Sequence, residues 1–119
     1  LVDERGEVAV MLEGQPQMEV GCHTDVMDSC PKSVAIPMLL RSANPQIIAV
    51  DEITQARDLA AMEEAAYCGV RFLATLHADS ADDLHRRPLL QKLQKMHLFE
   101  KAITIHMADT LRRYTIRDL

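Results

Sequence analysis

Two short apolar runs, each followed directly by residues that can carry charge, most constrain how this 119-residue chain folds. The run Ile47-Ile48-Ala49-Val50 ends on Asp51-Glu52, and the run from Val70 to Leu76 ends on His77. Continuous apolar runs of this length are typical of strands buried on both faces of a parallel sheet. We therefore predict two such strands, separated by one helical segment.

The segments around these runs have helical or strand-like patterns. Residues 32–43 predict a helix with Val34, Met38 and Leu39 on one face, and residues 56–68 predict a second helix that stops at Gly69. Pro88 begins or kinks a further helix that reaches about residue 96. The remaining expectations are a strand over 7–12, a loop over 13–21, a helix-start signal at Ser80-Ala81-Asp82-Asp83, and strands over 102–107 and 114–117.

The alternation of strands and helices predicts the α/β class, with a mostly parallel sheet flanked by helices. In such sheets ligands bind at the carboxyl ends of the strands. Asp51, Glu52 and His77 follow the two apolar runs, so we expect all three at one edge of the sheet.

Composition restricts the function classes. Hydrophobic residues make up 48% and charged residues 26% of the chain, which is typical of a globular domain, and no apolar stretch approaches the roughly 20 residues of a membrane span. The net charge of −5 argues against nucleic-acid binding as the main activity. Residues 81–119 carry 8 basic and 5 acidic groups, a surplus that suits a solvated helix face or an acidic neighbouring subunit.

The cysteines favour a reducing compartment. Cys22, Cys30 and Cys68 are three in number, so they cannot all pair with one another, and their spacing matches no zinc pattern. A metal site could be assembled from Cys22, His23, Cys30 and His77, but inert thiols are the favoured interpretation.

The acidic strand end carries the clearest chemical signal. One carboxylate of Asp51-Glu52 can hold magnesium, while the other orients and deprotonates a water that attacks a phosphate. His77 could donate a hydrogen bond to a terminal phosphate. The alternative is an ordinary acidic loop beside a histidine that packs at the sheet edge.

The motifs resemble a known family. The order of an apolar strand ending on Asp51-Glu52 and a later strand ending on His77 is similar to the Walker B and His-box order of secretion and pilus-motor ATPases. The wider pattern resembles the stage III sporulation protein AA family, over most of the chain. The segments that carry this resemblance are 2–7, Thr24-Asp25-Val26-Met27-Asp28-Ser29-Cys30-Pro31-Lys32, 40–45, 47–53, Arg57-Asp58, 73–78 and Arg86-Arg87-Pro88.

The resemblance implies a RecA-like ATPase that uses ATP and Mg²⁺. It assigns magnesium to Asp51, with Asp3 as a further metal position, and the attacking water to Glu52. It implies that His77 senses the terminal phosphate of ATP. It adds Glu4 as a second group for water or metal contact, and Arg5, Arg41 and Arg57 as cofactor-binding arginines that stabilise charge in the same or a neighbouring subunit.

The chain departs from the family pattern in two places. A P-loop is expected, yet no Gly-Lys pair occurs among the four glycines. We therefore expect the P-loop upstream, residues 1–119 as the C-terminal portion of the ATPase domain, and no turnover by this portion alone. The family pattern also has an arginine where this chain has His23.

The resemblance also implies partners and a location. The full-length protein is expected to form a homo-oligomeric ring, without nucleic acid, in the cytoplasm and docked on membrane-embedded sporulation channel proteins. The alternatives are a type II/IV secretion or pilus-retraction ATPase, and a non-catalytic interaction module with the same fold.

Overall fold

The computed structural model describes residues 1–78 and 83–119, which form two compact units, Leu1–His77 and Ala78–Leu119. Of the expected helix-start signal Ser80-Ala81-Asp82-Asp83, residues 80–82 lie outside the described residues.

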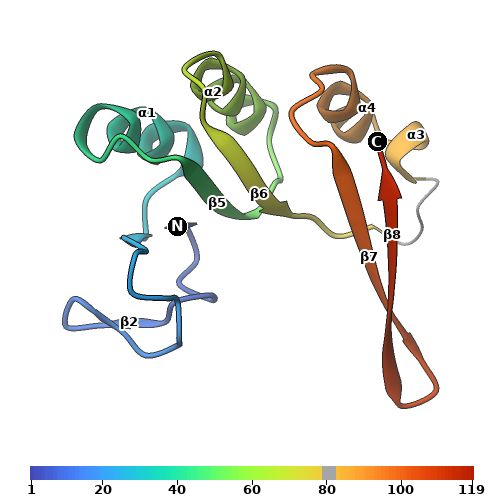
Figure 1. The fold of residues 1–119 in the computed structure, drawn as a ribbon, viewed down its shortest axis with the longest axis horizontal. Helices are drawn as coiled ribbons and strands as arrows, with labels where there is room; N and C mark the ends of the chain where they lie inside the picture. The colour runs from blue at the N-terminus through green and yellow to red at the C-terminus, as the bar shows by residue number, and fades with distance from the viewer. Residues whose placement is uncertain (79–82) are drawn as a thin grey trace. The chain divides into compact units, whose positions relative to one another are not determined.

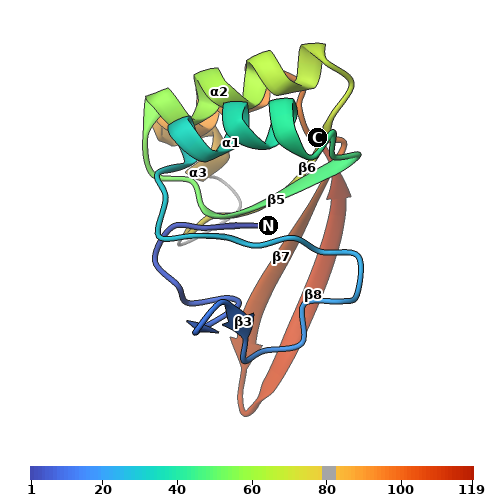
Figure 2. The same ribbon diagram turned by 90° about the vertical axis from the view of Figure 1, so that its left-hand side faces the viewer.

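The first unit is built on a four-stranded parallel sheet. Its strands are β1 (Val2–Asp3), β4 (Met27–Asp28), β5 (Ile47–Glu52) and β6 (Arg71–Thr75), in the order β4-β1-β5-β6. The helices α1 (Lys32–Ser42) and α2 (Ala56–Tyr67) pack against each other on one face of this sheet (Figures 1 and 2). A small antiparallel hairpin, β2 (Met11–Leu12) and β3 (Gln15–Pro16), completes the unit. The α/β class and the parallel sheet are confirmed, and the arrangement matches a partial RecA-like core.

The two helices begin and end where their sequences indicate. Pro31 precedes α1, and the Gln55 amide donates to Asp58 Oδ2 at 3.2 Å, which satisfies one open backbone group at the start of α2. Gly69 follows α2 with a φ of 86°, a left-handed conformation that favours glycine.

The buried face of α1 differs from the predicted one. Val34 and Met38 are about half exposed, and only Leu39 of the predicted set is buried. The buried residues are Lys32, Ala35, Ile36 and Leu39. Counted from Lys32, they follow at three, four and seven residues, which is the spacing of one helical face. Because the first residue of this face is a lysine, hydrophobicity alone selects the wrong face.

The expectation of strands buried on both faces is only partly met. Ile48, Val50 and Asp51 of β5 are buried, whereas Ile47 is 54% exposed. For β6 the expectation is wrong, because Leu73 is 64% exposed and exposure alternates along the strand. Strand β6 is the last strand of the described sheet, and α1 and α2 lie on one face only, so alternate side chains stay uncovered.

The predicted strand over residues 7–12 is also wrong, since only Met11–Leu12 is extended and paired. The amides of Glu7, Val8 and Ala9 instead donate to the carboxylate of Asp3, at 2.8 to 3.0 Å. These amides are therefore used by a side chain rather than by a sheet partner.

The second unit holds two helices and a hairpin. The helices are α3 (Asp83–Arg86) and α4 (Pro88–Lys95), and Pro88 begins α4 as predicted. The predicted strands over 102–107 and 114–117 are confirmed as β7 (Lys101–Ala108) and β8 (Leu111–Asp118). They pair antiparallel in a two-stranded ribbon that is separate from the parallel sheet.

Candidate functional site

The carboxyl ends of β1, β5 and β6 bring the predicted residues to one edge of the sheet. Glu4 follows β1, Asp51 and Glu52 end β5, and His77 lies two residues beyond β6. Glu52 is paired with Thr75 across β5 and β6. The expectation that the acidic strand end and the histidine-bearing strand end share an edge is therefore confirmed.

A buried lysine joins two of these carboxylates. The side chain of Lys32, in the first turn of α1, is 3% exposed. Its Nζ donates to Glu4 Oε2 at 2.7 Å and forms an ion pair with Asp51 Oδ1. Sequence reasoning gave Lys32 no role, although its place in the helical stripe with Ala35, Ile36 and Leu39 could have indicated that it points inward.

Each charge in this group stabilises the other. The hydrogen bond from Lys32 lowers the pKa of Glu4, and the positive field of Arg57 acts in the same direction. Burial by itself lowers the pKa of Lys32, but the hydrogen bonds from its ammonium to Asp51 and Glu4 outweigh burial, so the pKa is raised. The ammonium and the Glu4 carboxylate are thus both charged at neutral pH.

Asp51 keeps one oxygen available. The residue is 7% exposed, and within residues 1–78 and 83–119 no hydrogen-bond donor contacts its Oδ2 atom. An unpaired buried carboxylate oxygen is costly unless a ligand satisfies it. Hard divalent cations prefer such oxygens, and magnesium usually takes one or two protein carboxylates together with phosphates and waters. The site therefore fits a magnesium ion at Asp51.

Glu52 is held by an arginine. Its Oε2 atom accepts from Arg5 Nη2 at 2.9 Å, and the same nitrogen lies 3.0 Å from Glu7 Oε2. The side chain of Glu52 is 23% exposed, so water can reach it. Arg5 thus reaches the site, where it orients Glu52.

Asp3 has a different environment from the one its predicted metal role requires. It is fully buried, and both of its carboxylate oxygens accept backbone amides from residues 7–9. A carboxylate with both oxygens engaged in this way favours a structural role for Asp3 over magnesium binding.

The remaining predicted residues lie at different distances from this edge. Arg57, in the first turn of α2, is exposed and close enough to act on Glu4. His77 is exposed beside the end of β6. Arg41 is exposed in the last turn of α1, nine residues and roughly 14 Å along the helix from Lys32, so it does not join the site within this chain. Its predicted action in a neighbouring subunit stays a prediction.

The cysteine and histidine set does not assemble. In the part of the chain that the structure describes, no group of three or more His, Cys, Asp or Glu side chains is arranged to hold a metal. Cys22 and Cys68 are exposed free thiols, and Cys30 is a partly buried one.

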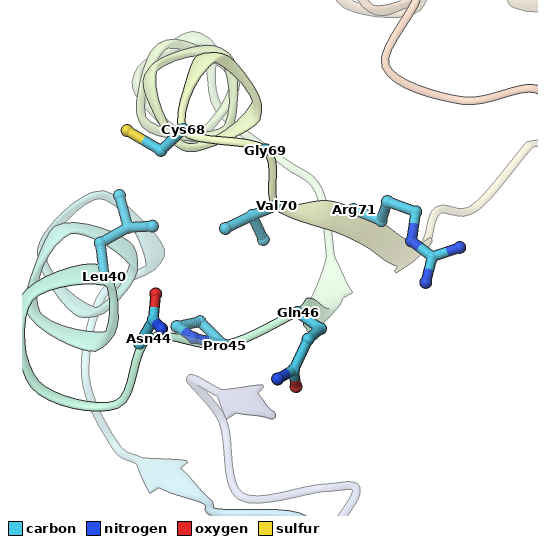
Figure 3. A pocket seen from close by; sticks show the side chains of 8 residues that line it. All are labelled: Leu40, Asn44, Pro45, Gln46, Cys68, Gly69, Val70 and Arg71. Atoms are coloured by element: carbon cyan, nitrogen blue, oxygen red, sulfur yellow. The ribbon is translucent and has the colours of Figure 1, made fainter.

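A separate hollow lies at the opposite edge of the first unit. It measures about 420 Å³ and lies between the end of α1, the end of α2 and the start of β6 (Figure 3). Leu40, Pro45 and Val70 line it, together with Cys68, and Arg71 points away from them. Among the described residues that line it there is no carboxylate, and it lies at the amino ends of β5 and β6, so it is not the site expected for an α/β sheet.

Fold and site define a class: an α/β protein with a partial RecA-like sheet whose carboxyl edge gathers acidic side chains around a buried lysine. The model of the family described as "Sporulation stage III, protein AA" matches residues 1–115. The chain is also 38% identical over 108 residues to Stage III sporulation protein AA of Bacillus subtilis (strain 168). The chain belongs to the Sporulation stage III, protein AA family, which confirms the resemblance.

That alignment covers 91% of this chain and 35% of the relative, so the chain spans little more than a third of the relative's length. No solved structure matches the chain. No helix in the described residues has both the length and the apolar character needed to cross a bilayer.

Proposed function

We propose that residues 1–119 are the C-terminal portion of an ATPase domain, and that the full-length protein hydrolyses ATP in support of sporulation. The name of the matching relative supports the link to sporulation. The resemblance to secretion and pilus motors supports ATP as the substrate. A homo-oligomeric ring docked on membrane-embedded channel proteins is the assembly that this resemblance favours.

One observation carries the proposal: a buried carboxylate with an unsatisfied oxygen stands next to a water-accessible carboxylate at the end of β5. Asp51 would hold the magnesium ion of Mg-ATP through Oδ2. When bound, magnesium supplies charge neutralisation on the phosphate oxygens. Glu52 orients the attacking water and accepts its proton at a carboxylate oxygen, while Arg5 keeps the Glu52 side chain directed to the edge.

The test is Mg-ATP turnover by the full-length protein, wild type beside Glu52→Gln. The substitution keeps the size of the side chain and removes the proton acceptor, so kcat should fall by about 100-fold or more while ATP binding persists. Glu64→Gln, an identical change on the exposed face of α2, is the matched control and should leave turnover unchanged.

Two outcomes contradict the proposal. Equal turnover in wild type and Glu52→Gln removes Glu52 from the chemistry. A folded wild-type protein that binds no ATP and shows no turnover favours the non-catalytic interaction module instead.

A further inference from the structure

We propose that Lys32 is a built-in cation that competes with the divalent ion for Asp51, so that a divalent ion binds there only when the ammonium group leaves. This inference rests on the proposed function in one respect, because it takes Asp51 as the magnesium-holding carboxylate. The new element is that the Lys32 ammonium occupies the Asp51 carboxylate before a metal ion binds.

The ammonium group of Lys32 already occupies a cation position. Lys32 Nζ lies between two carboxylates from different strand ends, 2.7 Å from Glu4 Oε2 and in contact with Asp51 Oδ1. Asp51 itself is more than nine-tenths buried, and among the described residues its Oδ2 has no hydrogen-bond donor. The lysine therefore already occupies the carboxylate in question, and Oδ2 is the oxygen that a divalent ion would take once the ammonium has left.

This position is also costly for a lysine. The Lys32 side chain is 3% exposed, so its charge is buried away from water. It also lies in the first turn of an 11-residue helix, where the helix dipole disfavours positive charge, and this turn contains no acidic residue. An apolar side chain would suit the buried stripe of α1 better, so the two carboxylates account for the lysine.

Electrostatic repulsion keeps a divalent ion and this ammonium group apart. A divalent ion on Asp51 and an ammonium on the same carboxylate would lie a few ångströms apart in a poorly hydrated place, where like charges repel strongly. Lys32 has a flexible four-carbon stem and can move away from Asp51 while Glu4 still holds it. Glu4 then remains the partner of the displaced ammonium group. This role of Glu4 differs from contact with water or a metal ion.

The test measures binding of Mn²⁺ alone, without nucleotide, by the full-length protein, using the electron paramagnetic resonance signal of free Mn²⁺. We expect Lys32→Met to bind Mn²⁺ at least about tenfold more tightly than wild type, because the competing charge is gone. Adding Asp51→Asn to Lys32→Met should abolish the gain. Lys101→Met is the matched control, since it removes an exposed lysine that pairs with Asp118 at 2.6 Å, and it should change nothing.

A second measurement needs no substitution and covers the case in which Lys32→Met does not fold. Amine acylation of the wild-type protein, read by mass spectrometry, should label Lys32 poorly without metal and several-fold faster with saturating Mn²⁺. Unchanged Mn²⁺ affinity in folded Lys32→Met, or unchanged labelling of wild-type Lys32, overturns the inference.

These results are separable from the test of ATP hydrolysis. Turnover that depends on Glu52, together with unchanged Mn²⁺ affinity in Lys32→Met, would reject the role of Lys32 and keep the ATPase. Tighter Mn²⁺ binding without any turnover would do the reverse.

Discussion

Two buried charged residues near the same sheet edge, Asp3 and Lys32, have different kinds of partner. Asp3 accepts hydrogen bonds from three backbone amides, so both of its carboxylate oxygens are satisfied within the chain. Among the described residues, the ammonium of Lys32 contacts the carboxylates of Glu4 and Asp51, and Asp51 retains an oxygen without a hydrogen-bond donor. The first charge fixes a loop, whereas we propose that the second changes partners when a divalent ion binds.

At the scale of the single residue, we predict that Asp3→Asn destabilises the full-length protein by about 3 kcal/mol, because an amide cannot replace both charged acceptors. Urea unfolding measures this change. Asp118→Asn removes an exposed carboxylate and should leave the unfolding free energy unchanged. If Asp3→Asn instead preserves stability and weakens Mn²⁺ binding, Asp3 is a metal ligand after all.

At the scale of the element, α1 combines two functions on one stripe. Ala35, Ile36 and Leu39 pack into the core, and Lys32 continues the same stripe to the acidic edge. The helix thus fixes the lysine through apolar packing one and two turns away. The half-exposed Val34 and Met38 lie outside this stripe.

The two faces of α1 predict unequal effects of truncation. Ile36→Ala should lower the unfolding free energy by about 3 kcal/mol, because it empties a fully buried position. Val34→Ala should cost less than about 1 kcal/mol, since half of that side chain is already in water. Equal costs in urea unfolding would mean that the buried face is assigned wrongly.

At the scale of the whole molecule, the group Glu4–Lys32–Asp51 links β1, α1 and β5, which are far apart in the sequence. The link depends on charge, so it depends on pH. The pKa of Glu4 is lowered from 4.5 on folding, so its contribution is complete above about pH 4.5 and is lost as the pH falls through the folded value. The pKa of Lys32 is raised from 10.5, so its contribution is complete below that value and is lost as the pH rises through the folded value.

We therefore predict that stability declines on the acid side of about pH 4.5 more steeply in wild type than in Glu4→Gln. Urea unfolding of the full-length protein across the acidic range measures the slope. Glu64→Gln, on the exposed face of α2, should keep the wild-type slope. Identical slopes in wild type and Glu4→Gln would show that the pairing of Glu4 with Lys32 adds nothing to stability.

The sequence by itself determined what depends on local patterns. The apolar runs before Asp51 and His77 predict strands, and parallel strands must bring their carboxyl ends to one edge, so the candidate edge could be predicted. Pro88 marks the start of a helix and Gly69 marks the end of another. Both signals come from the residue's own backbone preference, which does not depend on the tertiary structure.

Only the tertiary structure decided which charges are buried and which residues they contact. Lys32 meets Glu4 and Asp51 across separations that no local pattern encodes, and Asp3 removes a predicted strand by taking its amides. The energy of a buried charge comes from neighbours distant in sequence, whereas helix and strand signals come from near ones. For that reason the edge could be predicted from the sequence, while the partners of the lysine at its centre could not.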